Sequence, residues 1–306
     1  MILLGILAAS GADAAVGVAG YFAGGNTGSV VNTVDKFAFP SDSRTTLGTG
    51  LSSARRNATG MSNSGTAGYA AGGKTSSAVN TVDKFAFPSD SRTTLGTGLS
   101  ADRFHATGIS DSGVAGYVAG GYDSSNFSTV DKFAFPSDSR TTLGTGLSSA
   151  RRESAGMSNS GTAGYVAGGE TGSIVDTVDK FAFPSDSRTT LGTGLSADRS
   201  QLAGMSDSGV AGYVAGGQDG SVFSTVDKFA FPSDTRTTLA TGLSSARRLA
   251  TGMSNSGVAG YVAGGYTGSY VATVDKFAFP SDSRTTLGTG LSSGRRGLAG
   301  FQNEAI

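Results

Sequence analysis

The side chain best suited to acid–base chemistry in this sequence is its single histidine, His105. A histidine base needs a second group to orient it, and His105 has no recognisable partner in the sequence. Cysteine is absent, which excludes thiolate catalysis, disulfide bonds and zinc–cysteine sites, and one histidine is too few for a histidine-rich metal site. We therefore expect His105 to be a surface residue and the protein to be no enzyme.

Carboxylates are the remaining candidates for a metal site. Asp102 and Asp123, and their counterparts Asp198 and Asp219, lie in segments that we expect to share one surface. Ca²⁺ takes about six to eight oxygen ligands, so two carboxylates are too few. The many Gly-x-Gly strings open strands rather than helices, which argues against a dinucleotide site. We expect no metal and no cofactor.

The charge balance excludes another class of partner. Lysine plus arginine and aspartate plus glutamate number 23 each in 306 residues, so the formal net charge is zero. No overall field attracts nucleic acid or an acidic membrane surface.

These residues are carried by an internal repeat. The string VDKFAFP recurs at a spacing of 48 residues and begins at Val34, Val82, Val130, Val178, Val226 and Val274. A period of 40 to 50 residues with several short β-like runs is typical of propeller blades. The sequence predicts an all-β protein: a six-bladed β-propeller of four-stranded antiparallel blades over 17–306, after an N-terminal segment 1–16.

One unit illustrates the expected blade. Its four strands are predicted at 57–61, 67–71, 79–87 and 93–99, and Pro88 ends the third because proline cannot donate to a ladder. The apolar positions of this unit should pack between neighbouring blades; they are Tyr69, Val82, Phe85, Phe87 and Leu95.

The two ends of the chain predict closure of the ring. The first copy lacks a first strand, and the C-terminal segment 297–301 aligns with the first strands of the other copies. That segment should complete the first blade and leave no open edge. Charges that recur in every copy, such as Asp35, Lys36, Asp42, Arg44 and Arg55, are expected to form salt bridges within this framework.

Comparison of the six copies shows where they differ. One variable segment follows each glycine pair and, in the second copy, begins at Lys74. A variable dipeptide follows each invariant arginine and, in the second copy, begins at Arg56. In an up-and-down blade both loops emerge on the same side of the disc, so the variation should collect on one face. The candidate binding residues on this face are Lys74, Phe104, His105, Tyr122, Asp123, Phe127, Glu170, Gln218, Phe223 and Tyr266.

Two interpretations of this face remain open. The mixture of aromatic, charged and amide side chains suits a sugar or a protein surface. Neutral drift in tolerant loops is the alternative. The turns of the opposite face have not drifted, although tight Pro-Ser-Asp turn chemistry could keep them constant.

The sequence resembles the kelch-repeat propellers. The resemblance rests on the strand with its glycine pair, Gly-Tyr-Val-Ala-Gly-Gly at 116–121, on the aromatic residue near the end of the next strand, and on the arginine that opens the next blade, Arg103. The tryptophan usual in the fourth strand of that family is replaced by Leu95 and its equivalents. The resemblance implies a propeller that acts by binding.

The near-identical copies and the start MILLGILAASGADAA are also similar to structural proteins of tailed bacteriophages. Residues 2–9 are apolar, but eight residues are too few to span a bilayer. We expect this segment to anchor the propeller to other virion proteins in a homo- or hetero-oligomeric assembly, through the residues Ile2, Leu3, Leu4, Ile6 and Leu7.

The expected function is that of a non-enzymatic virion structural protein on the surface of the extracellular particle. The variable face of a phage tail-fibre or appendage subunit would bind a host glycan or protein. The alternative is a capsid or tail decoration protein with a purely structural role. A cellular scaffold or enzyme is a third, weaker alternative.

Overall fold

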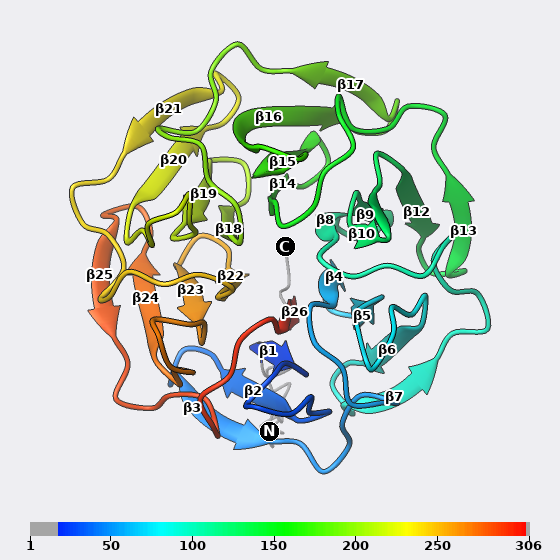
Figure 1. The fold of residues 1–306 in the computed structure, drawn as a ribbon. Helices are drawn as coiled ribbons and strands as arrows, with labels where there is room; N and C mark the ends of the chain where they lie inside the picture. Colours follow the sequence, from blue (N-terminus) through cyan, green and yellow to red (C-terminus); the bar gives the residue numbers. More distant parts are fainter. Residues whose placement is uncertain (1–17, 304–306) are drawn as a thin grey trace, which may run out of the picture.

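Each 48-residue unit folds into one four-stranded antiparallel sheet, and six such sheets surround a central axis as the blades of a propeller (Figure 1). The computed structural model describes residues 18–303, in which every regular element is a β-strand. The first strand of each blade lies nearest the axis and the fourth lies at the rim. The predicted all-β fold and number of blades are confirmed.

The strands of the blades, from the axis outward, have the following bounds. Blade 1 comprises β26 (Ala299–Asn303), β1 (Ala19–Ala23), β2 (Val34–Ala38) and β3 (Ser43–Thr46), and blade 2 comprises β4 (Thr59–Asn63), β5 (Ala67–Ala71), β6 (Val82–Ala86) and β7 (Ser91–Thr94). Blade 3 comprises β8 (Thr107–Asp111), β9 (Ala115–Ala119), β12 (Val130–Ala134) and β13 (Ser139–Thr142), with the small hairpin β10 (Tyr122–Asp123) and β11 (Ser125–Asn126) in its loop.

The remaining blades repeat this order. Blade 4 comprises β14 (Ala155–Asn159), β15 (Ala163–Glu170), β16 (Ile174–Ala182) and β17 (Ser187–Thr190), and blade 5 comprises β18 (Ala203–Asp207), β19 (Ala211–Ala215), β20 (Val226–Ala230) and β21 (Thr235–Thr238). Blade 6 comprises β22 (Thr251–Asn255), β23 (Ala259–Ala263), β24 (Val274–Ala278) and β25 (Ser283–Thr286).

The ring closes as predicted. Strand β26, from the C-terminal end of the described chain, pairs antiparallel with β1, and Tyr21 lies opposite Phe301. Blade 1 is therefore built from both ends of the sequence, and no blade lacks its innermost strand.

Three of the four strands of blade 2 differ from their predicted bounds at both ends, since the structure places them at 59–63, 82–86 and 91–94. The first strand of blade 2 begins at Thr59 rather than at Asn57, because Asn57 has a φ of 56°, which no strand residue adopts. The third strand begins at Val82, where its ladder with β5 starts. The fourth strand is only 91–94, since its ladder with β6 ends at the pair Asp83–Thr94.

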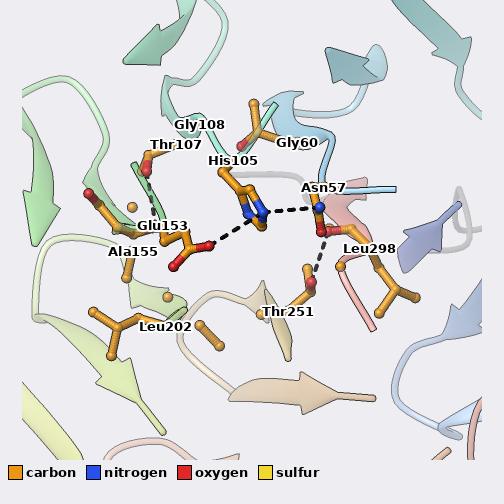
Figure 2. A pocket seen from close by; sticks show the side chains of 18 of the residues that line it. Asn57, Gly60, His105, Thr107, Gly108, Glu153, Ala155, Leu202, Thr251 and Leu298 are labelled. Atoms are coloured by element: carbon orange, nitrogen blue, oxygen red, sulfur yellow. Dashed lines mark hydrogen bonds and ion pairs between the residues drawn. The ribbon is translucent and has the colours of Figure 1, made fainter. Parts of the chain in front are cut away.

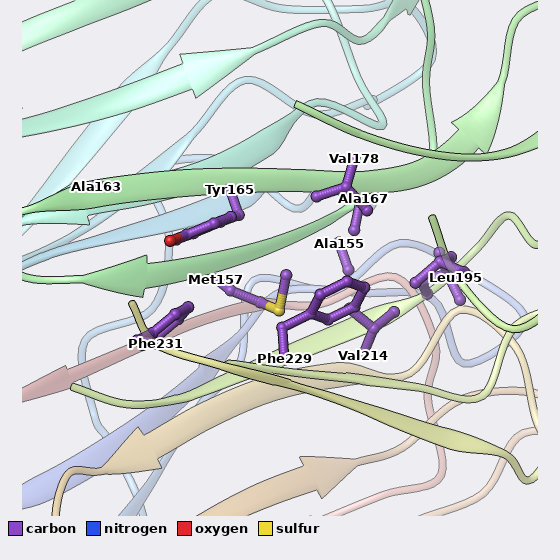
Figure 3. Close-up of a cluster of buried hydrophobic side chains, with 11 residues drawn as sticks. Ala155, Met157, Ala163, Tyr165, Ala167, Val178, Leu195, Val214, Phe229 and Phe231 are labelled. Carbon is purple, nitrogen blue, oxygen red and sulfur yellow. The ribbon is translucent and has the colours of Figure 1, made fainter. Parts of the chain in front are cut away.

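The hydrophobic core lies between blades, as the sequence predicts. In Figure 3, Met157 and Tyr165 of blade 4 pack against Phe229 and Phe231 of blade 5. In blade 2, Tyr69 and Val82 pack against blade 3, whereas Phe85 and Phe87 pack against blade 1.

Leu95 corrects one expectation about this core. It touches the cluster between blades 2 and 3 but is only half-buried, whereas Leu99 is 3% exposed. The cavity cost of about 2–5 kcal/mol that truncation of a buried leucine carries therefore belongs to Leu99.

The recurring charges form the predicted salt bridges. Asp90, in the turn of blade 2, accepts a hydrogen bond from the Tyr21 hydroxyl at 2.7 Å and pairs with Lys36 Nζ at 2.7 Å, both from blade 1. We call this tyrosine–lysine–aspartate contact the latch. The same latch joins the last blade to the first, where Tyr261 and Lys276 of blade 6 bind Asp42 of blade 1. These contacts tie each blade to the next.

The expected anchor segment, 1–16, lies outside the described residues. Between residues 18 and 303 the structure contains no helix long and apolar enough to cross a membrane.

Candidate functional site

The two variable loops of each unit meet on one face of the disc, as the comparison of copies predicts. The backbone of Arg56, in the crossing into blade 2, exchanges two hydrogen bonds with that of Lys74, at 3.0 and 2.8 Å. The other blades repeat this bridge, with the pairs Phe104–Tyr122, Arg152–Glu170, Ser200–Gln218, Arg248–Tyr266 and Arg296–Asn26. We call these twelve residues the outer ring.

A buried arginine holds each crossing loop in place. Arg55 is fully buried and pairs with the buried carboxylate of Asp83 at 2.9 Å. Its Nε and Nη2 donate to the carbonyl oxygens of Gly72 and Ala70 at 2.9 and 3.1 Å. Burial alone would raise the pKa of Asp83, but the backbone N–H of Ser52 and the charge of Arg55 outweigh it and hold the pKa below its ordinary value. The residues that follow the arginine are therefore presented from a rigid base.

Six of the outer-ring residues lie in the crossings between blades, and the residue that follows each of them lies at the mouth of the central channel. These residues are Asn57, His105, Glu153, Gln201, Leu249 and Gly297, which we call the inner ring. Each backbone N–H donates to the carbonyl of the preceding copy over 2.7 to 3.0 Å, and the last bond, from Asn57 to Gly297, closes the circle. All six have positive φ, between 54° and 64°. Six interblade hydrogen bonds thus fix the backbone without using a side chain.

The side chains of the inner ring are as different as its backbone is uniform. This is the only position of the repeat at which six copies carry six different residues. Positive φ is costly for residues other than glycine, and asparagine tolerates it best. Four of the six residues are neither glycine nor asparagine.

His105 is not the unaccompanied surface residue that the sequence predicts (Figure 2). Its Nε2 lies 3.1 Å from Asn57 Nδ2 and 3.4 Å from Glu153 Oε1, and its side chain is 15% exposed. Burial, together with the positive charges of Arg152, Arg56, Lys74 and Arg296, lowers the pKa of His105 to about 3. The imidazole is therefore neutral at physiological pH, and burial raises the pKa of the neighbouring Glu153.

Outer-ring side chains contact one another around the face. Lys74 Nζ lies 4.8 Å from the centre of the Phe104 ring, and the Arg152 guanidinium lies 4.4 Å from the centre of the Tyr122 ring. Arg152 also pairs with Glu170 at 2.8 Å. Five of the predicted binding residues therefore belong to one contact network, and Gln218 and Tyr266 belong to a second one around Arg248. The five are Lys74, Phe104, His105, Tyr122 and Glu170.

The other predicted binding residues lie apart from the rings. Phe127 and Phe223 pack over the buried guanidinium groups of Arg103 and Arg199, 5.7 and 5.9 Å from the ring centres. Asp123 is exposed at the tip of the β10–β11 hairpin. Between residues 18 and 303 no three carboxylate or imidazole side chains form a group that could hold a metal.

Glycines line the channel beneath the inner ring. The innermost strands approach so closely that a Cβ on Gly60 would overlap the carbonyl oxygen of Gly300, and the same contact recurs from blade to blade. We call these glycines the collar: Gly60, Gly108, Gly156, Gly204, Gly252 and Gly300. The collar separates the hollow of the variable face from a second hollow on the opposite side, which serines line.

Sequence reasoning identified the variable dipeptides but missed Asn57, Glu153 and Gln201 as parts of a site. The partners of His105 are the equivalent residues of the adjacent copies, each 48 positions away, so only the packing of neighbouring blades around the axis brings them together. The signal that could have found them is the complete divergence of this one position.

No protein-family model matches the chain, and no curated protein sequence matches it.

Proposed function

We propose that the protein is a non-enzymatic virion protein, a tail-fibre or appendage subunit that binds the host surface through its variable face. The observation that carries this proposal is the concentration of sequence variation in the loops of one face, including the two concentric rings, on a rigid scaffold. Binding proteins commonly present variable side chains from loops that a fixed framework holds.

The inner ring favours selection for binding over neutral drift. Drift constrained only by stability should favour glycine or asparagine at a position of positive φ. His105, Glu153, Gln201 and Leu249 occupy it instead, with φ between 54° and 61°. Their retention at a conformational cost is expected if their side chains contact a ligand.

The virion assignment rests on resemblance. The repeat resembles kelch propellers, which supports action by binding, and the near-identical copies are similar to structural proteins of tailed bacteriophages. In this proposal segment 1–16 joins the propeller to other virion proteins. Deletion of residues 1–15 should leave a folded disc that no longer enters the particle, and survival of assembly would contradict the anchor.

Attachment of particles to cells tests the binding role. Tyr122→Ala with Tyr266→Ala should reduce adsorption at least tenfold while particles stay intact, because aromatic residues dominate binding energy at interfaces. The matched control is Val114→Ala with Val210→Ala, which removes exposed apolar side chains from the opposite face. Phe127 and Phe223 are left unchanged because they cover buried arginines.

The outcomes separate the candidate roles. Equal adsorption of both variants would favour the decoration protein, whose propeller stabilises the particle and recognises nothing outside it. Turnover of host polysaccharide by the purified chain would contradict the non-enzymatic assignment.

A further inference from the structure

Positive charge without a partner is concentrated around the channel mouth of the variable face. All but four of the chain's 23 lysine and arginine side chains form an ion pair with a carboxylate of the described residues. The four exceptions are Arg56, Lys74, Arg248 and Arg296, and all four belong to the outer ring. In a protein of zero net charge, this is a local site for an anion.

Three of these cations line one hollow together with the inner ring. This hollow, the well, has a volume of about 210 Å³, and its lining includes Arg56, Arg248 and Arg296. The buried Nε atoms of Arg56 and Arg248 have no hydrogen-bond partner among the described residues. Framework arginines such as Arg44 and Arg92 also have such an Nε atom, so what distinguishes Arg56 and Arg248 is the absence of a carboxylate partner.

The floor of the well offers further hydrogen-bonding groups. Glu153 is 7% exposed, its Oε2 has no partner among the described residues, and the same holds for Oε1 of Gln201. Asn57 and the neutral His105 add further donors and acceptors (Figure 2). Leu249 forms an apolar part of the lining.

We propose that the well binds the acidic sugar of a host glycan. The carboxylate of the sugar would accept charge-assisted hydrogen bonds from the guanidinium groups of the rim, and its hydroxyl groups would bind Glu153, Gln201 and Asn57. The apolar face of the pyranose ring would lie against Leu249. This inference rests on the proposed function and specifies its ligand.

A free inorganic anion or an acidic peptide fits these observations less well. An inorganic anion would use the guanidinium rim but would leave Glu153 Oε2 and Gln201 Oε1 unsatisfied. An acidic peptide needs an extended surface, whereas the partnerless groups converge on one small hollow.

Direct binding to the purified full chain tests the inference. Glucuronate, galacturonate and N-acetylneuraminate are titrated at low salt, with glucose and galactose as uncharged controls, and binding is followed by ligand-observed NMR. At least one acidic sugar should bind, while the uncharged sugars should bind at least tenfold more weakly. Arg56→Gln, Arg248→Gln and Arg296→Gln together should weaken acidic-sugar binding at least tenfold.

The matched control keeps the change in charge but moves it away from the well. Arg44→Gln, Arg92→Gln and Arg140→Gln remove three half-buried arginines that pair with Asp35, Asp83 and Asp131. This variant should bind the sugars as the unchanged protein does. Equal loss in both variants would reduce the effect to overall charge and overturn the inference.

Three further results would each overturn the proposal that the well binds an acidic sugar. They are failure of all three acidic sugars to bind, binding of inorganic phosphate or sulfate as tightly as the sugars, and binding of a glutamate-rich peptide alone. Adsorption that still depends on Tyr122 and Tyr266 would then show that the proposed function stands while its ligand is not an acidic sugar.

Discussion

The two ends of the central channel are built from the same six innermost strands but vary in opposite ways. On one side of the collar, the inner ring carries six different residues. On the other side lie serines at equivalent positions of five copies, Ser62, Ser110, Ser158, Ser206 and Ser254, and only Gln302 departs from them.

The hydrogen bonds between blades explain the contrast. At the inner ring each bond joins a backbone N–H to a backbone carbonyl, as from His105 to Asn57 at 3.0 Å. At the serine end the backbone N–H donates to a side-chain hydroxyl, as from Ser110 to Ser158 Oγ at 2.9 Å. A side chain that accepts an interblade hydrogen bond is constrained, and five of six copies keep serine there, whereas a side chain that takes no part in these bonds is free to vary.

The largest effect should separate two adjacent arginines. Arg151→Met removes the fully buried partner of Asp179, which lies 2.9 Å away, and should reduce the free energy of unfolding by about 3–5 kcal/mol. Arg152→Met removes a half-exposed outer-ring cation and should cost less than about 1 kcal/mol. Chemical denaturation of both variants measures the difference. Similar losses would contradict the view that the buried arginine holds the loop in place while the outer-ring arginine contributes little to stability.

The collar should be less tolerant than either ring. Gly156→Ala places a Cβ against the carbonyl oxygen of Gly108, and since both groups are backbone-bound, the strands must separate. We expect a loss of about 1–3 kcal/mol or more in the free energy of unfolding. Gly192→Ala is a suitable control, because nothing lies near a Cβ added there. A loss as large in the control would show that the close approach of the strands is not the cause.

A pair of substitutions compares the two ends of the channel directly. Ser158→Ala removes the acceptor of the Ser110 N–H and should cost about 1–2 kcal/mol. Gln201→Asn changes the inner ring to a residue that the repeat already carries at Asn57, and the free energy of unfolding should change by less than about 0.5 kcal/mol. Equal costs would mean that inner-ring side chains also hold the propeller together.

Much of the framework could be predicted from the sequence because it depends on the period. The spacing of VDKFAFP gave the number of blades, and the unmatched first strand gave the closure through β26. The latch at Asp90 followed from charges that recur in every copy.

The site could be predicted only in part because it depends on local conformation and on contacts between neighbouring blades. The dipeptide Phe104-His105 was recognised as variable, but nothing in its composition shows that only its second residue faces the axis. That orientation follows from the φ of 56° at His105. A histidine in a sequence does not indicate positive φ, as a glycine or an asparagine would. Its contact with Glu153 then requires a neighbouring blade.

The last prediction concerns the dependence of stability on pH. It tests whether burying His105 in the inner ring costs free energy, a cost that the serines at the other end of the channel do not carry. The pKa of His105, about 3, lies below its ordinary value of 6.5, so the unfolded chain binds a proton that the folded chain excludes. This contribution to stability is complete above pH 6.5 and is lost as the pH falls towards 3. The raised pKa of Glu153 acts oppositely, because lowering the pH towards 4.5 stabilises the folded state.

Glu153→Gln should therefore expose the histidine contribution. In this variant the free energy of unfolding should fall by about 1 kcal/mol between pH 6.5 and 5.5. Adding His105→Gln, which copies Gln201 with its φ of 58°, should abolish that fall. Five buried framework aspartates do not interfere, since their pKa values lie below the ordinary 3.8; they are Asp35, Asp83, Asp179, Asp227 and Asp275. A pH slope that persists without His105 would show that the inner ring bears no such cost and would weaken the argument for selection at this position.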